Sequence, residues 1–289
     1  MKKLIFSILL LASTLLQASD IYVKPGESIA DAIRQARELR RLNDPSIEGG
    51  ITIHVAAGNY RIYEPLFLRP EDSGTPSSPT IIKGEGEVIV SGGVTVTGWK
   101  RQGKLMVADV PDFCGRPLDF RQFYVNGKKA VRARDVADFE DMYRIIRVDK
   151  QKRVLWVPAA AVRKIQKAPY AEMVLHEMWC VANLRIKDIM FAGDSAAVSF
   201  HDPESRIQFE HPWPCPMVTT DGHNSAFYLT NARELLDVPG EWYHDIRAGK
   251  LYYYPRQGEL IEEAVVPAVE TLLRVEGTLD RPVRNIRIE

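Results

Sequence analysis

The chain has 289 residues, of which 45% are hydrophobic and 26% are charged, and its 38 Lys and Arg residues balance its 38 Asp and Glu residues. This composition, without a low-complexity segment, is that of a folded protein with a large core. The even charge balance argues against a nucleic-acid binder, because such proteins carry an excess of basic residues on one face.

The first eighteen residues have the pattern of a cleavable export signal. Lys2 and Lys3 precede an apolar run that ends at Leu16, and the small residue Ala18 stands before Ser19. A basic start, a short apolar core and a small residue at the break are typical of a secretory signal peptide. We therefore expect a secreted or periplasmic protein cut after Ala18. The run is shorter than the ~20 apolar residues of a spanning helix, so no membrane span is expected.

The next segment predicts one helix. Ser28 can cap a helix that has Asp31 three positions further on, and apolar residues recur at helical spacing from Ile29 to Leu39. Arg40 and the Arg that follows it suit a helix C-terminus. Because the helix has one apolar stripe and one charged face, we expect it to cover the apolar interior of the structure that follows.

From residue 51 the pattern changes to short β-strands separated by tight turns. Apolar and β-branched residues group into segments of three to five at residues 51–55, 66–68, 80–82 and 88–90. Gly, Pro, Asp or Ser bounds each segment. Strands this short are typical of the coils of a parallel β-helix. The same pattern resumes between residues 272 and 288.

The middle of the chain has an antiparallel pattern instead. Asn126-Gly127 lies between two short apolar segments and favours the type I′ turn of a β-hairpin. Two further hairpins are expected, one around residues 149–153 and one around Ala248-Gly249. This pattern predicts an inserted β-sandwich or open barrel.

These patterns together predict an all-β fold. It is the start of a right-handed parallel β-helix with an N-terminal capping helix and an inserted antiparallel β-domain. The expected order is a signal peptide over residues 1–18, the capping helix and first coils over 19–98, the inserted domain over 99–262 and resumed, truncated coils over 263–289.

Several segments resemble known proteins. Residues 53–60 resemble the first coil of pectate-lyase-like β-helix proteins, and residues 91–93 with Trp99 resemble the exit from the second coil of a group of exported enzymes. The most specific match covers residues 229–256, which include the block Pro-Gly-Glu-Trp-Tyr at 239–243. On these residues the chain resembles the N-terminal portion of Bacteroidetes carbohydrate enzymes of glycoside hydrolase family 141.

The resemblance implies an α-L-fucosidase or a xylanase that acts on plant or host polysaccharide. In that family the acidic catalytic pair lies on later coils, so the resemblance implies that the catalytic residues lie beyond Glu289 and that this portion is inactive alone. Two rivals stay open. One is a polysaccharide lyase of β-helix type, which the near-neutral charge balance disfavours because an acidic substrate favours a basic cleft. The other is a non-catalytic glycan-binding protein or a truncated gene product.

Glu177 is the catalytic candidate within the chain. Alternation from Met173 to Val181 predicts that it shares an apolar face with Trp179. Desolvation there would raise the pKa of its carboxyl group, as a general acid requires. The alternative is a structural carboxylate in a β-bulge or paired with Arg185.

Four residues are candidates for substrate binding. Trp213 stands between Pro212 and Pro214, which stiffen the loop and could hold the ring as a platform for a sugar; alternatively, the ring fills a gap between the two structural regions. Trp179 is the second aromatic candidate. His223 and Asn224 follow a polar turn and could contact a ligand, or they could simply form the turn.

No metal or cofactor site is expected. His176, His201 and His244 have no metal-type spacing with other His or Cys residues. The three cysteines, Cys114, Cys180 and Cys215, allow one disulfide at most, of which the pair Cys114 and Cys215 is the first to test. We expect three buried thiols instead.

Overall fold

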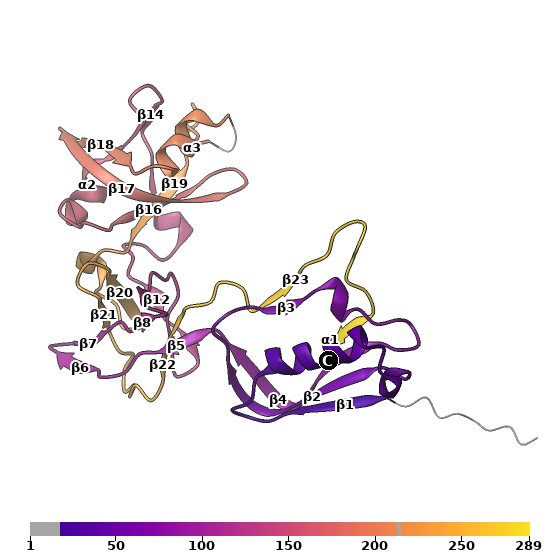
Figure 1. Ribbon diagram of the computed structural model, residues 1–289. Coiled ribbons are helices and arrows are strands. Elements are labelled where there is room, and N and C mark those ends of the chain that lie inside the picture. Colours follow the sequence, from indigo (N-terminus) through magenta and orange to yellow (C-terminus); the bar gives the residue numbers. More distant parts are fainter. Residues whose placement is uncertain (1–17, 213–214) are drawn as a thin grey trace, which may run out of the picture. The chain divides into compact units, whose positions relative to one another are not determined.

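The computed structural model describes residues 18–212 and 215–289, and these divide into two compact units. Unit 1 holds the described residues up to Gly93 together with Ala268–Glu289, and unit 2 holds Val94–Pro267. Each unit has its own hydrophobic core. Figure 1 draws unit 1 in indigo, violet and yellow, and unit 2 from magenta to orange. The domain boundaries expected near residues 98 and 262 stay predictions.

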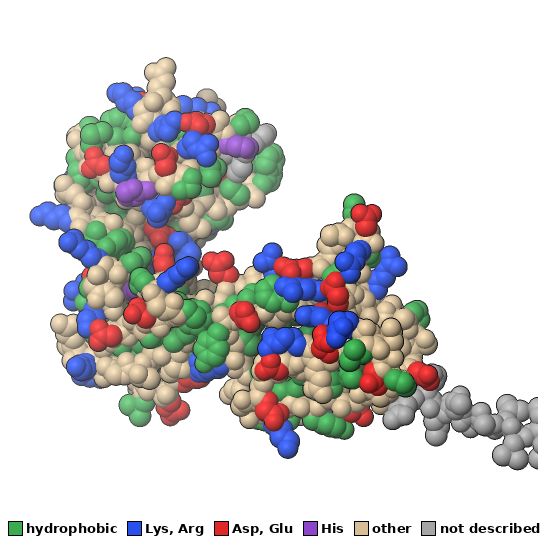
Figure 2. All heavy atoms as spheres, viewed as in Figure 1, with side chains coloured by type: hydrophobic (Ala, Val, Ile, Leu, Met, Phe, Trp, Pro, Cys, Tyr) green, Lys and Arg blue, Asp and Glu red, His purple; other side chains and the backbone are tan. Residues whose placement is uncertain are grey.

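The predicted signal peptide lies, apart from Ala18, outside the described residues. Within the described part of the chain, no helix combines the length and the apolar character that a membrane crossing requires. Figure 2 shows acidic and basic side chains interspersed over the face in view.

Unit 1 is built around a parallel sheet with one helix against it. The four-stranded sheet has the order β1-β2-β4-β24, and every neighbour pair in it is parallel. A second parallel pair joins β3 to β23. The elements of unit 1 are β1 (Ser19–Val23), α1 (Ile29–Arg41), β2 (Ile51–Arg61), β3 (Leu66–Leu68), β4 (Thr80–Ser91), β23 (Leu273–Val275), β24 (Ile286–Ile288) and two 3₁₀ helices, Pro45–Ile47 and Pro70–Asp72.

The helix expected after Ser28 is present as α1. The side chain of Ser28 accepts a hydrogen bond from the backbone N–H of Asp31 at 3.2 Å, which satisfies one donor of the first turn. The apolar stripe packs into the core of the unit, and its buried members are Ile29, Ala32, Ile33 and Ala36. The exposed face of the helix carries the charged residues Asp31, Arg34, Glu38 and Arg41, as expected of an amphipathic helix.

The predicted fold class, the start of a right-handed parallel β-helix, is wrong. A β-helix repeats short strands that stack coil on coil into long parallel sheets. The described residues instead form several separate sheets of mixed type with a few helices, and the largest sheet is antiparallel throughout. The strands β2 and β4 are 11 and 12 residues long, because they continue where turns were expected. A bulge interrupts the ladder between Ala56 and Gly58: it leaves Gly86 unpaired, and pairing resumes with Gly58 opposite Val88. Both glycines have a positive φ.

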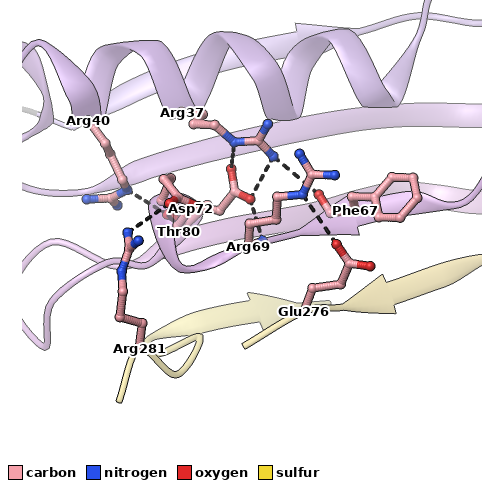
Figure 3. A network of polar contacts seen from close by, with 9 residues as sticks. Arg37, Arg40, Phe67, Arg69, Asp72, Thr80, Glu276 and Arg281 are labelled. Carbon is pink, nitrogen blue, oxygen red and sulfur yellow. Dashed lines mark hydrogen bonds and ion pairs between the residues drawn. The ribbon is translucent and has the colours of Figure 1, made fainter. Parts of the chain in front are cut away.

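A buried carboxylate ties the segments of unit 1 together (Figure 3). Both oxygens of Asp72 accept hydrogen bonds from the guanidinium of Arg37, each at 2.8 Å, and one oxygen also accepts from the backbone N–H of Arg69 at 2.7 Å. Arg40 donates to the hydroxyl of Thr80 at 2.8 Å, and that hydroxyl donates to the backbone carbonyl of Asp72. The network therefore joins α1 to β4 through the segment that follows β3.

The parallel sheet of unit 1 also carries a pH-sensitive contact. The two ring nitrogens of His54 lie 2.8 Å from an oxygen of Glu85 and 3.0 Å from an oxygen of Asp20, and the ring stacks on Tyr22 at 4.9 Å. Glu85 also contacts Lys83 at 3.3 Å. Hydrogen bonds from the ring to Glu85 first, and then to Asp20, raise the pKa of His54 above its ordinary value because they favour the imidazolium.

We expect the stability of unit 1 to fall as the pH rises from about 6 to about 8. A raised pKa in the folded state means that the stabilisation is complete below the ordinary pKa of His and is lost as the pH rises through the folded value. Urea unfolding followed by far-UV circular dichroism at both pH values measures the change. His54→Gln should remove the part of the pH dependence that this histidine causes; an unchanged dependence in that variant would show that another group is responsible.

Unit 2 contains the remaining sheets, two short α-helices and three 3₁₀ helices, Phe139–Asp141, Arg163–Ile165 and Arg233–Leu235. Its largest sheet has seven strands in the order β13-β19-β16-β17-β18-β15-β14, and others have the orders β12-β20-β21-β7-β6 and β11-β10-β22-β5. The elements are β5 (Gly93–Thr95), β6 (Lys100–Gln102), β7 (Leu105–Asp109), β8 (Asp112–Phe113), β9 (Arg116–Pro117), β10 (Tyr124–Val125), β11 (Lys128–Lys129), β12 (Val131–Arg132), β13 (Tyr143–Arg144), β14 (Arg147–Asp149), β15 (Val154–Pro158), α2 (Ala159–Val162), β16 (Glu172–His176), β17 (Val181–Ala192), β18 (Ser195–Phe200), α3 (Glu204–Glu210), β19 (Ala226–Thr230), β20 (Glu241–Asp245), β21 (Lys250–Tyr253) and β22 (Ala264–Pro267).

The three predicted hairpins of unit 2 are present. β10 and β11 pair antiparallel around Asn126-Gly127, whose φ angles of 49° and 71° are those of the expected type I′ turn. β14 pairs with β15, and β20 with β21, at the other two predicted positions. Local turn chemistry therefore determines these three connections.

All three cysteines are free. Cys114 is exposed, and Cys180 and Cys215 are partly exposed. The prediction of three buried thiols is therefore wrong, most clearly for Cys114. This residue has a φ of 51° in the turn between β8 and β9.

Candidate functional site

The seven-stranded sheet of unit 2 has one apolar face and one polar face. Met173 and Leu175 of β16 point into the hydrophobic core, so the alternate residues Glu172, Val174 and His176 lie on the other side. We call this side the outer face. It comprises these three residues and their aligned neighbours on β17 and β19, which include Asn183, Arg185, Tyr228 and Thr230.

A pocket of about 360 Å³ opens over the outer face. Val174 and its two aligned neighbours, Asn183 and Tyr228, contribute to its lining. Apart from Thr230, the other lining residues come from the segment between residues 121 and 134 and are mostly basic: they include Arg121, Lys129, Arg132 and Arg134. The pocket therefore combines a cationic wall with a tyrosine ring and an amide.

Glu172 holds two of these arginines in place. Arg121 donates to both oxygens of the carboxylate, at 3.2 Å to Oε1 and also to Oε2, and Arg132 donates to Oε2 at 3.0 Å. The Glu172 side chain is 6% exposed and that of Arg132 is 12% exposed, so both charges are largely removed from water. Burial lowers the pKa of Arg132, and the neighbouring Glu172 opposes that effect. Arg132 also lies over the ring of Trp242 at 5.7 Å.

The other two cations have no carboxylate within ion-pair distance in the described parts of the chain. The side chain of Arg134 is half-buried and that of Lys129 is exposed. Asp119 is close enough to act on Arg132 but does not contact it. The pocket therefore presents four cationic groups against one contacting carboxylate, and its local potential is positive although the whole chain is neutral.

Aromatic side chains continue the outer face beyond the pocket. The ring of Tyr228 lies 6.1 Å from that of His176, which in turn meets the half-exposed ring of Phe139 at 5.5 Å, edge to face. Arg144 lies over the Phe139 ring at 4.6 Å. Burial first, and then the charge of Arg144, lower the pKa of His176, which favours the neutral ring.

Glu177 lies in the turn that joins β16 to β17, not inside a strand. Its backbone N–H donates to the carbonyl of Cys180 at 2.9 Å, which closes the turn. Burial raises the pKa of the Glu177 carboxyl group, as a general acid requires. Its side-chain partners are the Cys180 thiol at 3.0 Å and the Gln208 amide, while Arg185 pairs with Glu204. Neither partner of Glu177 is the second carboxylate that glycoside hydrolysis uses.

The same Cys180 thiol is kept protonated. Burial first, and then the adjacent Glu177, raise the pKa of Cys180 to about 11. A thiol in this state is a hydrogen-bond donor and a poor nucleophile. The role of the Cys180 thiol at the turn is therefore to donate a hydrogen bond to the Glu177 carboxyl group.

The structure brings three of the predicted binding residues, Trp179, His223 and Asn224, to the same end of the sheet. The Trp179 side chain, at the tip of the β16–β17 turn, is 71% exposed. Since Ala226 pairs with His176, His223 and Asn224 precede β19 at that end. His223 is exposed, whereas Asn224 bonds the backbone of Thr219 and Ile145, both at 2.8 Å. Trp213 lies outside the described residues.

Residues 18–212 and 215–289 contain no group of three or more His, Cys, Asp or Glu side chains arranged to hold a metal ion.

Comparison with known proteins identifies the inserted region. Residues 103–256, more than half of the chain, match the model of the GH141 insertion domain. The chain belongs to the GH141 family. A solved structure named "Glycoside hydrolase" has 61% sequence identity and a TM-score of 0.90, and the alignment covers 94% of this chain and 50% of that one. This GH141 chain thus spans half the length of the solved structure that it matches. No curated protein matches it.

The comparisons confirm the predicted family, and the solved structure that matches this GH141 chain is itself named a glycoside hydrolase. Sequence reasoning missed the basic pocket. The signal that could have found it is the run Lys129-Ala130-Val131-Arg132-Ala133-Arg134, in which extended backbone places Arg132 and Arg134 on one side.

Proposed function

We propose that this GH141 chain is an exported carbohydrate-active protein and that the outer face of unit 2 binds its glycan. The pocket beside Tyr228 is the observation that carries the proposal. Its volume lies within the range of small-ligand sites, and its tyrosine and asparagine supply the ring surface and the hydrogen bonds that sugars use. Export follows from the proposed signal peptide, and N-terminal sequencing of the mature protein should begin at Ser19.

The aromatic rings extend the proposed binding surface from the pocket to the turn. Tyr228, His176 and Phe139 follow one another across the outer face, and the exposed ring of Trp179 stands at the tip of the adjoining turn. Flat rings cover the apolar faces of pyranose sugars at little cost in side-chain entropy. A surface of this kind suits an oligosaccharide that is longer than the pocket.

We propose that the residues that perform the chemical step lie in the part of the longer GH141 protein that this chain does not cover. Glycoside hydrolysis uses two carboxyl groups at a set separation, and Glu177 contacts a thiol and an amide instead. We propose that the whole protein acts as an α-L-fucosidase or a xylanase, and that residues 19–289 bind glycan without hydrolysing it. Turnover of an aryl fucoside or of xylan by these residues would contradict that division.

Trp179→Ala is expected to weaken glycan binding by about 2- to 13-fold, because an aromatic contact contributes roughly 0.5–1.5 kcal/mol. Isothermal titration calorimetry with xylo-oligosaccharides and fucosylated oligosaccharides measures the change. Met190→Ala is the control, since Met190 is an exposed apolar residue of β17, the strand that follows the turn, and lies away from that turn. Equal loss in both variants, or no binding by the unaltered protein, would refute the proposed site.

A further inference from the structure

We infer that the pocket on the outer face recognises the negative group of an acidic glycan, either a uronate carboxylate or a sulfate ester. The inference rests on the proposed function, because it names the class of sugar that the same face binds. Four cationic side chains line a pocket of about 360 Å³, and one carboxylate contacts them.

The two pairs of cations have different roles. Arg121 and Arg132 share the carboxylate of Glu172, which fixes their guanidinium groups at the wall of the pocket. Arg134 and Lys129 line the same pocket, and in the described segments no carboxylate lies within ion-pair distance of them. Their charges are therefore available to a ligand, and the Arg132 Nε atom is a further buried donor with no partner there.

An anion bound here would meet donors that are already oriented. An arginine fork binds carboxylate or sulfate through parallel hydrogen bonds, and such charge-assisted bonds are about twice as strong as neutral ones. Pairing with Glu172 removes much of the side-chain freedom that Arg121 and Arg132 would otherwise lose on binding. Tyr228 is then available to pack against the sugar ring, and Asn183 is available to bond the hydroxyl groups of the sugar.

A pair of matched ligands tests the inference. Tri-galacturonate carries one carboxylate on each sugar, and its methyl ester keeps the same rings and hydroxyl groups without the charges. We expect calorimetry to show that the ester binds about tenfold more weakly or worse, since hydrogen bonds to charged groups contribute more than neutral ones. Added salt should weaken binding of the acid and leave that of the ester nearly unchanged. A sulfated galacto-oligosaccharide forms a third arm that distinguishes sulfate from carboxylate.

Matched variants test whether the preference for the charged ligand arises in the pocket. Lys129→Met combined with Arg134→Met should abolish the preference for the charged ligand, while Lys128→Met should leave it intact. Lys128 is the neighbouring exposed residue of β11 and does not line the pocket. Neither pocket substitution breaks an ion pair within the described chain, so the thermal transitions of the variants should match that of the unaltered protein, and this match checks their folding.

Each result decides the matter. If the protein binds tri-galacturonate or the sulfated oligosaccharide more tightly than the methyl ester, and only the variant of Lys129 and Arg134 loses this preference, the inference is supported and the anion is identified. Equal binding of acid and ester, with the affinity still dependent on Trp179, overturns the inference and leaves the proposed function standing. A charge preference that survives the pocket substitutions overturns it as well. If no glycan binds at all, the proposed function fails together with the inference.

Discussion

Asp72→Ala is expected to lower the free energy of unfolding of unit 1 by about 3–5 kcal/mol, because removing one partner of a buried ion pair leaves the other charge uncompensated. Asp72 is 3% exposed, and it receives both hydrogen bonds of the Arg37 guanidinium, whose side chain is 22% exposed (Figure 3). The substitution also frees the backbone N–H of Arg69. Urea unfolding measures the loss.

The neighbouring Glu71→Ala is the matched control. Glu71 pairs with Arg281 at 2.8 Å, but both side chains are exposed, so little change in stability is expected. All five tryptophans lie in unit 2, so far-UV circular dichroism of α1, the longest helix among the described residues, should report on unit 1. Equal stability of the two variants would show that the Asp72 network contributes no more than a surface ion pair.

Glu172→Ala is the corresponding substitution in unit 2, with an expected loss of about 3–5 kcal/mol in the free energy of unfolding. It leaves Arg132 buried without its carboxylate and exposes Arg121 and Arg132 to mutual repulsion at the wall of the pocket. Tryptophan fluorescence during urea unfolding reports on this unit.

Glu210→Ala is the control for that measurement. Glu210 pairs with Arg153 between α3 and the β14–β15 turn, and both side chains are more than one third exposed. We therefore expect its replacement to change the unfolding transition little. A Glu172 variant as stable as this control would mean that Arg132 finds another partner or that water enters the pocket.

Local signals predicted the helix and the hairpins of this protein well. Ser28 caps α1, and Asn126-Gly127 forms the hairpin turn with both residues at positive φ, because these residue types satisfy backbone requirements within a few positions. Such signals do not depend on distant parts of the chain.

The arrangement of the sheets could not be predicted in the same way. The short-strand pattern predicts turns in the segments 56–65 and 83–87, whereas the structure has a bulge within long parallel strands there, with Gly58 and Gly86 at positive φ. A glycine permits both conformations, and the pairing partner decides between them. Interpreting these segments as turns leads to the prediction of repeated short coils, and therefore to the wrong fold class.

The candidate site shows the same division between local and distant information. Alternation placed Glu177 within a strand, but the turn closed by Glu177 and Cys180 ends β16 at His176. The neutral balance of the chain disfavoured a basic cleft, yet net charge sums over the whole surface and conceals where the cations gather. Arg121, Arg132 and Glu172 meet only when the sheet forms, so their association has no local signal.

A crystal structure of the protein with tri-galacturonate bound is the most direct test of the account. We predict that the ligand lies on the outer face of unit 2, with a carboxylate hydrogen-bonded to Arg134 or Lys129 and a sugar ring against Tyr228. Ligand bound at another surface, with the pocket left empty, would contradict both the proposed site and its preference for acidic sugars.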